Sequence, residues 1–253
     1  MTRRVLPVVT GVGVLLAGWQ VLVATGGVAP RLLPSPARVA QQAWAHRDAL
    51  AVHAGATLTV TLVGFGVSVL VAAVLAVGLD FAPHLRAGVV PLLVASQTVP
   101  VLVVAPLLVL WFGFGLLPKV LVVTLVTFFP VAIGLVEGFG AAGPRASALL
   151  RTMGASRWQE FRHVRLPAAM PRFFTALRIG VTYAVVGAVV AEYAGAVSGL
   201  GTWMTMQRAA FRTDLVLAAV GVCAGLTLAL YAVVRGVEHV VVPWGRPRAV
   251  RRG

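Results

Sequence analysis

The polar stretch that decides the fold of this chain runs from Pro144 to Pro171 and reads PRASALLRTMGASRWQEFRHVRLPAAMP. Long apolar runs precede and follow it. With Arg172 just beyond its end, it carries six arginines against one acid, Glu160. Basic segments beside membrane helices remain on the cytoplasmic side. We therefore expect this segment to lie in the cytoplasm, between helices that cross a membrane.

The local pattern in this stretch predicts two short helices that meet at a glycine. Pro144 suits a first helical turn, and Gly154 supplies the left-handed residue that closes a helix. Ser156, with Gln159 three residues later, forms a capping box that opens the second helix. We expect a bent helical pair on the membrane surface, shaped to fit a partner.

One face of the second short helix is apolar. Trp158, Phe161 and Val164 fall within one arc of it, opposite the polar residues of the same helix. Such a face can be buried against a partner protein, against the chain's own helices or in lipid headgroups. The residues alone leave these alternatives open.

The composition is that of a membrane protein. Of the 253 residues, 59% are hydrophobic and only 11% are charged, which excludes an ordinary soluble domain. The formal net charge of +14 comes from basic residues in the gaps between apolar runs, without aromatic interleaving, so it indicates membrane orientation and not nucleic-acid binding. Cys223 is the single cysteine, which excludes an intrachain disulfide.

Six apolar runs of membrane-spanning length follow one another along the chain. They cover residues 6–28, 57–78, 87–112, 120–138, 173–196 and 215–234. The first follows a short basic start and exceeds the ~7–15-residue apolar core of a signal peptide, so we interpret it as an uncleaved helix. The segment 29–53 is expected to be a loop that contains a short helix over 37–45.

The third apolar run is interrupted by polar residues and a proline. Gln97, Thr98 and Pro100 lie in mid-span, and Pro100 leaves a carbonyl one turn back without its helical partner. We expect a kinked helix there. The polar side chains either line a path through the membrane or join helices within the bundle.

The distribution of basic residues sets the orientation. With the amino terminus inside, the 79–87 turn, the 141–172 loop and the 235–253 tail lie in the cytoplasm and, with Arg3 and Arg4, hold 14 of the 21 Lys and Arg residues. The sequence therefore predicts an all-α polytopic membrane protein. It would have six transmembrane helices and both termini in the cytoplasm, in one domain over residues 1–253.

Motifs for nucleotide binding, metal binding and catalysis are missing from the sequence. The only lysine, Lys119, stands in Leu-Pro-Lys-Val, without the glycine and hydroxyl residue of a phosphate-binding loop. The five histidines do not pair at a metal-ligand spacing. We expect no catalytic residue, metal site or cofactor on this chain.

Glu192 is the only acid well inside a predicted span. It either lines or gates a path, or it has a structural role and pairs with an outer arginine such as Arg208 or Arg212.

With these features in view, nearly the whole chain resembles a permease subunit of bacterial ATP-binding-cassette importers of type I. The branch is the one that includes permeases for sulfonates, taurine, nitrate and the pyrimidine precursor of thiamine. The residues that carry the resemblance are Leu33-Pro34-Ser35-Pro36, the run from Ala105 to Gly113 (APLLVLWFG), Phe128-Phe129-Pro130, the run from Gly187 to Glu192 (GAVVAE) and Ser198-Gly199-Leu200-Gly201.

The 144–171 segment resembles the cytoplasmic loop of that superfamily, in which Glu-Ala-Ala is followed by a glycine and later by a hydrophobic pair before proline. Gly154, Leu166 and Pro167 match in place, and we expect the two-helix segment to end at Leu166-Pro167. Ala stands at 148 where the family has Glu, which puts a charged contact to the ATPase in doubt but not the helix. The resemblance implies an ATPase-coupling role for Ala148, Leu149, Leu150, Arg151, Gly154, Ser156, Trp158, Phe161, Leu166 and Pro167.

The resemblance also implies function and partners. The chain would form half of a translocation path, with Gln97, Thr98, Pro100 and Glu192 as candidate path residues. Its partners would be a second permease subunit, most simply an identical copy, ABC ATPase subunits that bind ATP and Mg, and an external substrate-binding protein. The location would be the bacterial cytoplasmic (inner) membrane.

The resemblance also indicates a class of substrate. The runs 95–100, 149–154 and 171–177 look most like permeases for a pyrimidine thiamine precursor or riboflavin, with sulfonate, taurine or nitrate as the alternative. From another class, a secondary transporter driven by an ion gradient would need more buried acids than this chain offers.

Overall fold

The computed structural model describes residues 2–26, 29 and 32–245, and within these ranges it contains helices and no strand. The α-helices are α1 (Thr2–Ala24), α2 (Pro36–Ala45), α3 (Arg47–Phe81), α4 (Pro83–Ser96), α5 (Val101–Phe112), α6 (Leu116–Gly140), α7 (Pro144–Thr152), α8 (Arg157–Glu160), α9 (Leu166–Tyr193), α10 (Leu200–Ala209) and α11 (Thr213–Val241). A wider turn, η1 (Phe161–Arg165), joins α8 to α9.

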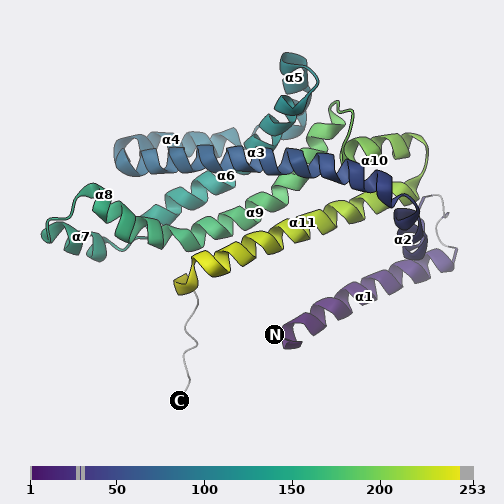
Figure 1. Ribbon diagram of the computed structural model, residues 1–253, viewed down its shortest axis with the longest axis horizontal. Helices are drawn as coiled ribbons and strands as arrows, with labels where there is room; N and C mark the ends of the chain where they lie inside the picture. Colours follow the sequence, from purple (N-terminus) through teal and green to yellow (C-terminus); the bar gives the residue numbers. More distant parts are fainter. Residues whose placement is uncertain (1, 27–28, 30–31, 246–253) are drawn as a thin grey trace.

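Three helices, α3, α6 and α9, form the centre of the bundle, and α11 runs along α9 (Figure 1). Their contact surfaces are made of small and branched apolar residues, among them Ala72, Val131, Ala132 and Ala169, each fully buried. On α6, Gly134 and Gly138 lie directly against α9. Small residues spaced by four let membrane helices approach closely, and Gly134 and Gly138 bring α6 against α9 in this way.

Four helices are long and apolar enough to cross a membrane: α3, α6, the continuous helix from Arg157 to Tyr193, and α11. A fifth span results if α4 and α5 count as one broken helix. Helix α1, predicted as the first span over 6–28, is 23 residues long, and its stretch Thr10–Ala24 is apolar. The prediction of a polytopic all-α membrane protein is therefore confirmed, whereas six spans and two cytoplasmic termini stay predictions.

The kink predicted in the third span is a break. Helices α4 and α5 meet at an angle of 92°, and α5 points away from the bundle (Figure 1). Thr98 donates its backbone N–H to Ala95 only three residues back (3.1 Å), and Pro100 has an extended backbone (φ −69°, ψ 115°). Since Pro100 has no N–H to continue the helix, the chain turns and starts a new one.

The second short helix does not end at Leu166 and Pro167, as the sequence had suggested. It continues through η1 into α9, and in the wider turn the Leu166 N–H donates to the Phe161 carbonyl, five residues back. Pro167 then lies in the first turn of α9, where the missing N–H costs little. Helix α8 is thus continuous with α9.

Other elements also differ from the prediction. Helix α3 begins at Arg47, within the expected 29–53 loop, and α10 was not predicted at all. Helix α11 continues to Val241 instead of ending at 234, because Glu238 pairs with Arg178 on α9 and keeps the last turns attached. Part of the predicted 235–253 tail is therefore helical. Residues 246–253 lie outside the described part, as do residues 27–28 at the end of the predicted first span.

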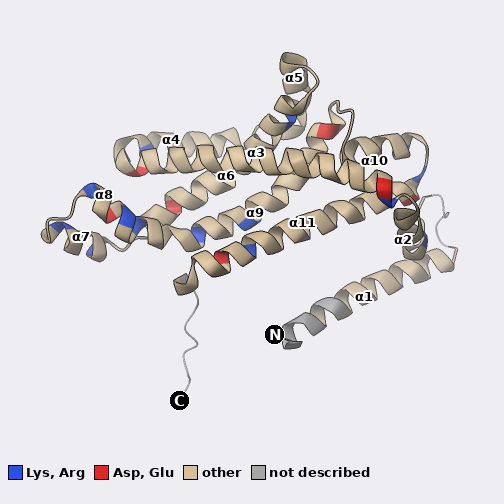
Figure 2. Ribbon diagram, in the orientation of Figure 1, with Lys and Arg blue, Asp and Glu red and all other residues tan. Residues whose placement is uncertain are grey.

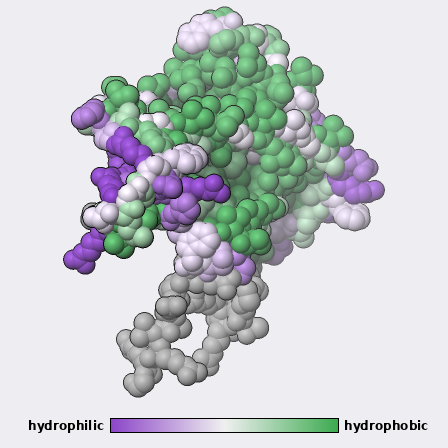
Figure 3. Space-filling model, turned by 60° about the vertical axis from the view of Figure 1, so that its left-hand side comes forward, coloured by the Kyte–Doolittle hydropathy of each residue, from purple (hydrophilic) through white to green (hydrophobic). Residues whose placement is uncertain are grey.

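Charged residues gather at the ends of the bundle. Figure 2 shows Lys and Arg residues concentrated on α7 and α8, at the end opposite α2 and α10. Figure 3, which brings this end forward, shows a hydrophilic patch against a largely hydrophobic body. This separation matches a bundle set in a membrane with α7 and α8 in water.

Candidate functional site

The turn between α7 and α8 has the predicted geometry. Gly154 has φ +77°, in the left-handed region, and an added Cβ there would meet nothing within 4 Å. The Ala155 N–H closes the helix by donating to the Leu150 carbonyl (2.9 Å). The capping box is also present, since the Ser156 hydroxyl accepts from the Gln159 N–H (3.3 Å) and the Gln159 side chain accepts from the Ser156 N–H (2.7 Å).

Helix α7 presents apolar side chains to water. Leu149 is 62% exposed and Met153, at its end, is 73% exposed, while Ala148 is also exposed and Leu150 is half-buried. Contiguous exposed apolar surface marks contact sites for other proteins. The apolar side chains of α7 are open to such a partner.

The aromatic face of α8 is divided between the bundle and the surface. Phe161 is buried against Phe81 of α3 and Phe139 of α6, with ring centroids 5.4 and 5.3 Å apart. Trp158 stacks on Phe81 and Phe161 but remains 58% exposed. The sequence had placed both among the residues that contact an ATPase, and in this structure only Trp158 is accessible. Leu166 and Pro167 are half-buried at the start of α9.

A chain of ion pairs runs beneath α7. The Arg151 Nε donates to one oxygen of Glu160 (2.9 Å), and the Arg165 guanidinium binds the other oxygen (2.8 Å) and also Asp80 on α3 (2.7 Å). Ser147 on α7 is buried beside Glu160. The side chains of Glu160 and Asp80 are only 3% and 6% exposed. We refer to Arg151, Glu160, Arg165 and Asp80 as the ion-pair chain.

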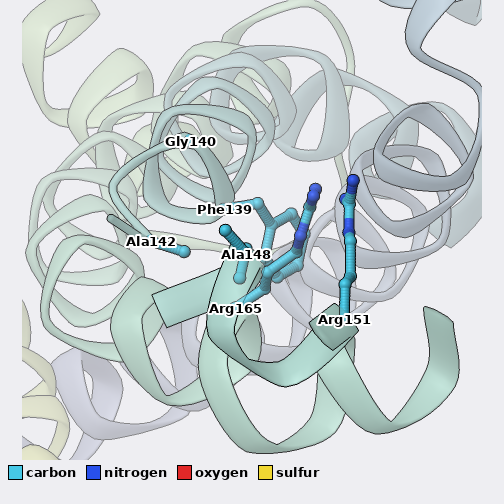
Figure 4. Close-up of a pocket in the computed structure, with 7 residues that line it drawn as sticks. Phe139, Gly140, Ala142, Ala148, Arg151 and Arg165 are labelled. Atoms are coloured by element: carbon cyan, nitrogen blue, oxygen red, sulfur yellow. The ribbon is translucent and has the colours of Figure 1, made fainter. Parts of the chain in front are cut away.

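A cleft of about 530 Å³ opens beside this chain, between the end of α6 and α7 (Figure 4). Its walls include Phe139, Ser147, Ala148, Arg151 and Arg165. Ala148, which stands in place of the Glu of the loop pattern that the segment resembles, thus faces this cleft. The charged residues that line the cleft are Arg151 and Arg165.

The neighbouring helix ends are held by other arginines. Arg86, after α3, donates to the Val136 carbonyl (3.2 Å), and Arg172 on α9 donates to the Glu137 carbonyl (2.6 Å). Cations at a helix carboxyl end satisfy its free carbonyls and its dipole. The last turn of α6, which forms one wall of the cleft, is fixed in this way.

Glu192 lies in a second buried polar cluster, at the opposite end of the bundle. Its carboxylate accepts from the Thr57 hydroxyl (2.8 Å) and from the Gly201 N–H (2.7 Å), and the Leu200 N–H donates to Thr57 (2.8 Å). The side chain is 2% exposed. A Cβ at Gly199 would lie 2.1 Å from the Glu192 carboxyl carbon, so only glycine allows this approach.

This cluster bears on the two roles considered for Glu192. The carboxylate joins α3, α9 and the start of α10. The predicted pairing with Arg208 or Arg212 is not found among the described residues, where Arg212 lies beside Asp214 and donates to Gln42. The structural interpretation of Glu192 is the one that the contacts favour.

Gln97, Thr98 and Pro100 are exposed at the break between α4 and α5. The Thr98 hydroxyl donates to the nearby Ala95 carbonyl (2.8 Å). These residues therefore do not join helices within this chain. They remain available to line a path or to meet another subunit.

Sequence reasoning missed Asp80, Ser147 and Arg165 as parts of the cytoplasmic site, and Thr57 as a partner of Glu192. The Arg165–Asp80 pair is 85 residues apart in the chain, so no local period reveals it. One signal was present, because Glu160 was the only acid among six arginines.

Comparison with known proteins gives consistent matches. A family model described as "Binding-protein-dependent transport system inner membrane component" matches residues 52–245. The formylaminopyrimidine transport permease protein of Halalkalibacterium halodurans is 34% identical, covering 91% of this chain and 92% of the relative. The riboflavin transport system permease protein of Chloroflexus aurantiacus is 38% identical (91% and 87%), and the taurine transport system permease protein of Escherichia coli is 30% identical (96% and 91%).

Proposed function

The chain belongs to the family of binding-protein-dependent transport system inner membrane components, and from this premise we propose how it acts in an ATP-binding-cassette importer. It is a multi-pass permease subunit of the inner membrane. In our proposal two copies form the translocation path, two ATPase subunits bind ATP and Mg on the cytoplasmic side, and an external binding protein delivers the solute. This chain itself performs no catalysis, and its domain extends over residues 1–253.

The observation that carries the proposed coupling is the form of α7. This helix lies outside the bundle at its basic end, exposes Leu149 and Met153, and is joined to α8 by the left-handed Gly154. An ATPase that binds α7 would move α8 when it moves α7, and α8 is continuous with α9. Closure of the ATPase pair would in this way reach the membrane helices through the 144–171 segment.

The path is the second element of the proposal. Gln97, Thr98 and Pro100 are exposed where α4 and α5 break. A broken helix with free polar groups suits a solute path that forms only when a second copy closes around it. Glu192, buried in its own cluster, would keep α10 in place beside this path.

For the substrate, we propose a pyrimidine precursor of thiamine or a riboflavin-like heterocycle. Two relatives that cover about nine tenths of the chain are permeases whose names give formylaminopyrimidine and riboflavin. A taurine permease also aligns, at lower identity, and sulfonate, taurine or nitrate is the alternative.

The test is uptake by vesicles that contain the permease with its own ATPase and binding protein. We expect ATP-dependent uptake of labelled formylaminopyrimidine or riboflavin, and none of taurine. Uptake of taurine alone would overturn the substrate proposal but not the family assignment. Uptake that an uncoupler abolishes at constant ATP would indicate an ion-gradient transporter instead.

Gly154→Pro tests the coupling segment in the same vesicles. Proline cannot adopt the φ of +77° found at Gly154, so α7 and α8 would lose their relative orientation. We expect loss of uptake with the variant chain still present in the membrane. Undiminished uptake would refute coupling through this segment.

A further inference from the structure

Helix α7 is joined to the bundle through a single carboxylate. Within residues 2–26, 29 and 32–245, the side-chain hydrogen bonds and ion pairs from α7 to other elements run from Arg151 to Glu160, with Ser147 buried beside them. The other hydrogen bonds of α7 are internal or local to its two ends. Without Glu160, the backbone at Gly154 would be the main connection between α7 and the rest of the segment.

Glu160 is linked onward to two membrane helices. Its oxygen Oε1 accepts from Nε and NH2 of Arg165 (3.0 and 2.8 Å), and Arg165 is the residue directly before α9. The NH1 of the same guanidinium donates to Asp80, in the last turn of α3. One planar guanidinium thus bridges two carboxylates, a geometry that fixes both in direction as well as in distance.

The surroundings make this arrangement stiff. Glu160 and Asp80 are almost fully buried, and the Phe81, Trp158 and Phe161 rings stack beside them. The two carboxylates are shielded from water, although the Arg151 side chain is 58% exposed, and removing a guanidinium from either carboxylate leaves an uncompensated buried charge. We expect these contacts to persist when α7 is displaced.

We propose that Glu160 is the positioning residue that transmits displacement of α7 to α3 and α9, through Arg151 on one side and Arg165 with Asp80 on the other. This inference rests on the proposed function, in which an ATPase contacts α7. It assigns to an acid inside the chain the task of making α7 and the membrane helices move together. Gly154 then sets the angle between α7 and α8, and Glu160 transmits the displacement of α7 to α3 and α9.

The experiment compares two substitutions of glutamate by glutamine at the same end of the bundle. Glu160→Gln removes the buried charge. Glu137→Gln is the matched control. Glu137 is exposed at the end of α6, and its side chain does not belong to the ion-pair chain. Three quantities are measured in vesicles: ATPase retained on the permease, ATP hydrolysed in the presence of loaded binding protein, and solute taken up per ATP.

We expect Glu160→Gln to retain the ATPase subunits and to hydrolyse ATP, while solute per ATP falls about fivefold or more, the lower end of the range for coupling between sites. Glu137→Gln should match the unsubstituted chain in all three measurements. An unchanged ratio in Glu160→Gln would overturn the proposal. So would a parallel loss of hydrolysis and uptake, since that pattern indicates a purely structural role.

A second variant decides the matter if Glu160→Gln fails to assemble. Asp80→Asn leaves Arg151, Glu160 and Arg165 paired and weakens only the link to α3. We expect a smaller fall in solute per ATP with hydrolysis retained, and an unchanged ratio would refute transmission through α3. Absence of ATP-dependent uptake by the unsubstituted chain would instead refute the proposed function itself.

Discussion

The close approach of α6 to α9 at Gly134 allows a quantitative prediction. A Cβ added at Gly134 would lie 2.4 Å from the Ala176 Cβ, whereas carbon atoms in ordinary contact are about 3.5–4.0 Å apart. Gly134→Ala therefore forces the two helices apart by roughly 1 Å or more at this point. Their separation would disturb the packing of the fully buried neighbours Val131 and Ala132.

The expected cost follows from two opposing effects. Overpacking a well-packed core costs about 1–3 kcal/mol, and replacing a helical glycine by alanine returns about 1 kcal/mol through helix propensity. Gly66→Ala on α3 is the matched control, because a Cβ there meets nothing within 4 Å. Since the propensity gain is common to both variants, their difference isolates the clash, at about 1–3 kcal/mol.

The assay is the fraction of detergent-purified protein that remains monodisperse after heating at one fixed rate. For a chain of this size about 1 kcal/mol shifts the melting temperature by roughly 2–4 °C, so Gly134→Ala should melt several degrees below Gly66→Ala. Adding Ala176→Gly to Gly134→Ala should restore the melting temperature, because the next atoms, at 3.5 and 3.8 Å, are at ordinary contact distance. Equal melting of the two single variants, or no recovery in the double variant, would refute this packing.

Three further predictions concern the two polar sites. Gly154→Ala should cost about 1–2 kcal/mol in the left-handed turn and speed proteolysis between α7 and α8, with Gly154→Asn affected less; equal cleavage of all forms would contradict the turn. Ser156→Ala should remove about 1 kcal/mol of capping and speed hydrogen exchange of the amide three residues later; unchanged exchange would show that the cap contributes nothing. Glu192→Ala should lower the melting temperature, because the Gly201 N–H loses its buried acceptor, at about 1–3 kcal/mol, while the Thr57 hydroxyl can still donate to the His53 carbonyl (3.2 Å). Lost uptake with an unchanged melting temperature would place Glu192 on the path instead.

Local features of the site were predictable because they depend on a few consecutive residues. The left-handed turn at Gly154 and the capping box of Ser156 with Gln159 follow from backbone geometry and hydrogen bonding within one turn. The short helix α2 was predicted over 37–45 and begins at Pro36, with the Ser35 hydroxyl accepting from the Arg38 N–H. In each of these elements, the residues that determine the local structure lie within the element or directly beside it.

Other features depended on residues far away in the chain. Pro167 looked like a helix end, yet the wider turn at Phe161–Arg165 lets the helix pass through it. Phe161 looked like a contact for a partner, yet Phe81 and Phe139 cover it. Helix α10 is only ten residues long, and besides the apolar contacts of Leu200, Trp203 and Met204 its start is held by Glu192 and Thr57, which come from two other helices.

The sequence by itself determined that this is an all-α membrane protein with a basic segment around Gly154. The reason is that hydropathy, the distribution of charged residues and the residues that favour turns can all be read from consecutive stretches of the chain. Only the tertiary structure decided which of the charged groups are coupled. Asp80 and Glu160 come from elements far apart in sequence and share the Arg165 guanidinium. Ion pairs depend on distances of a few ångströms in space, and those distances exist only once α3, α6 and α9 have packed together.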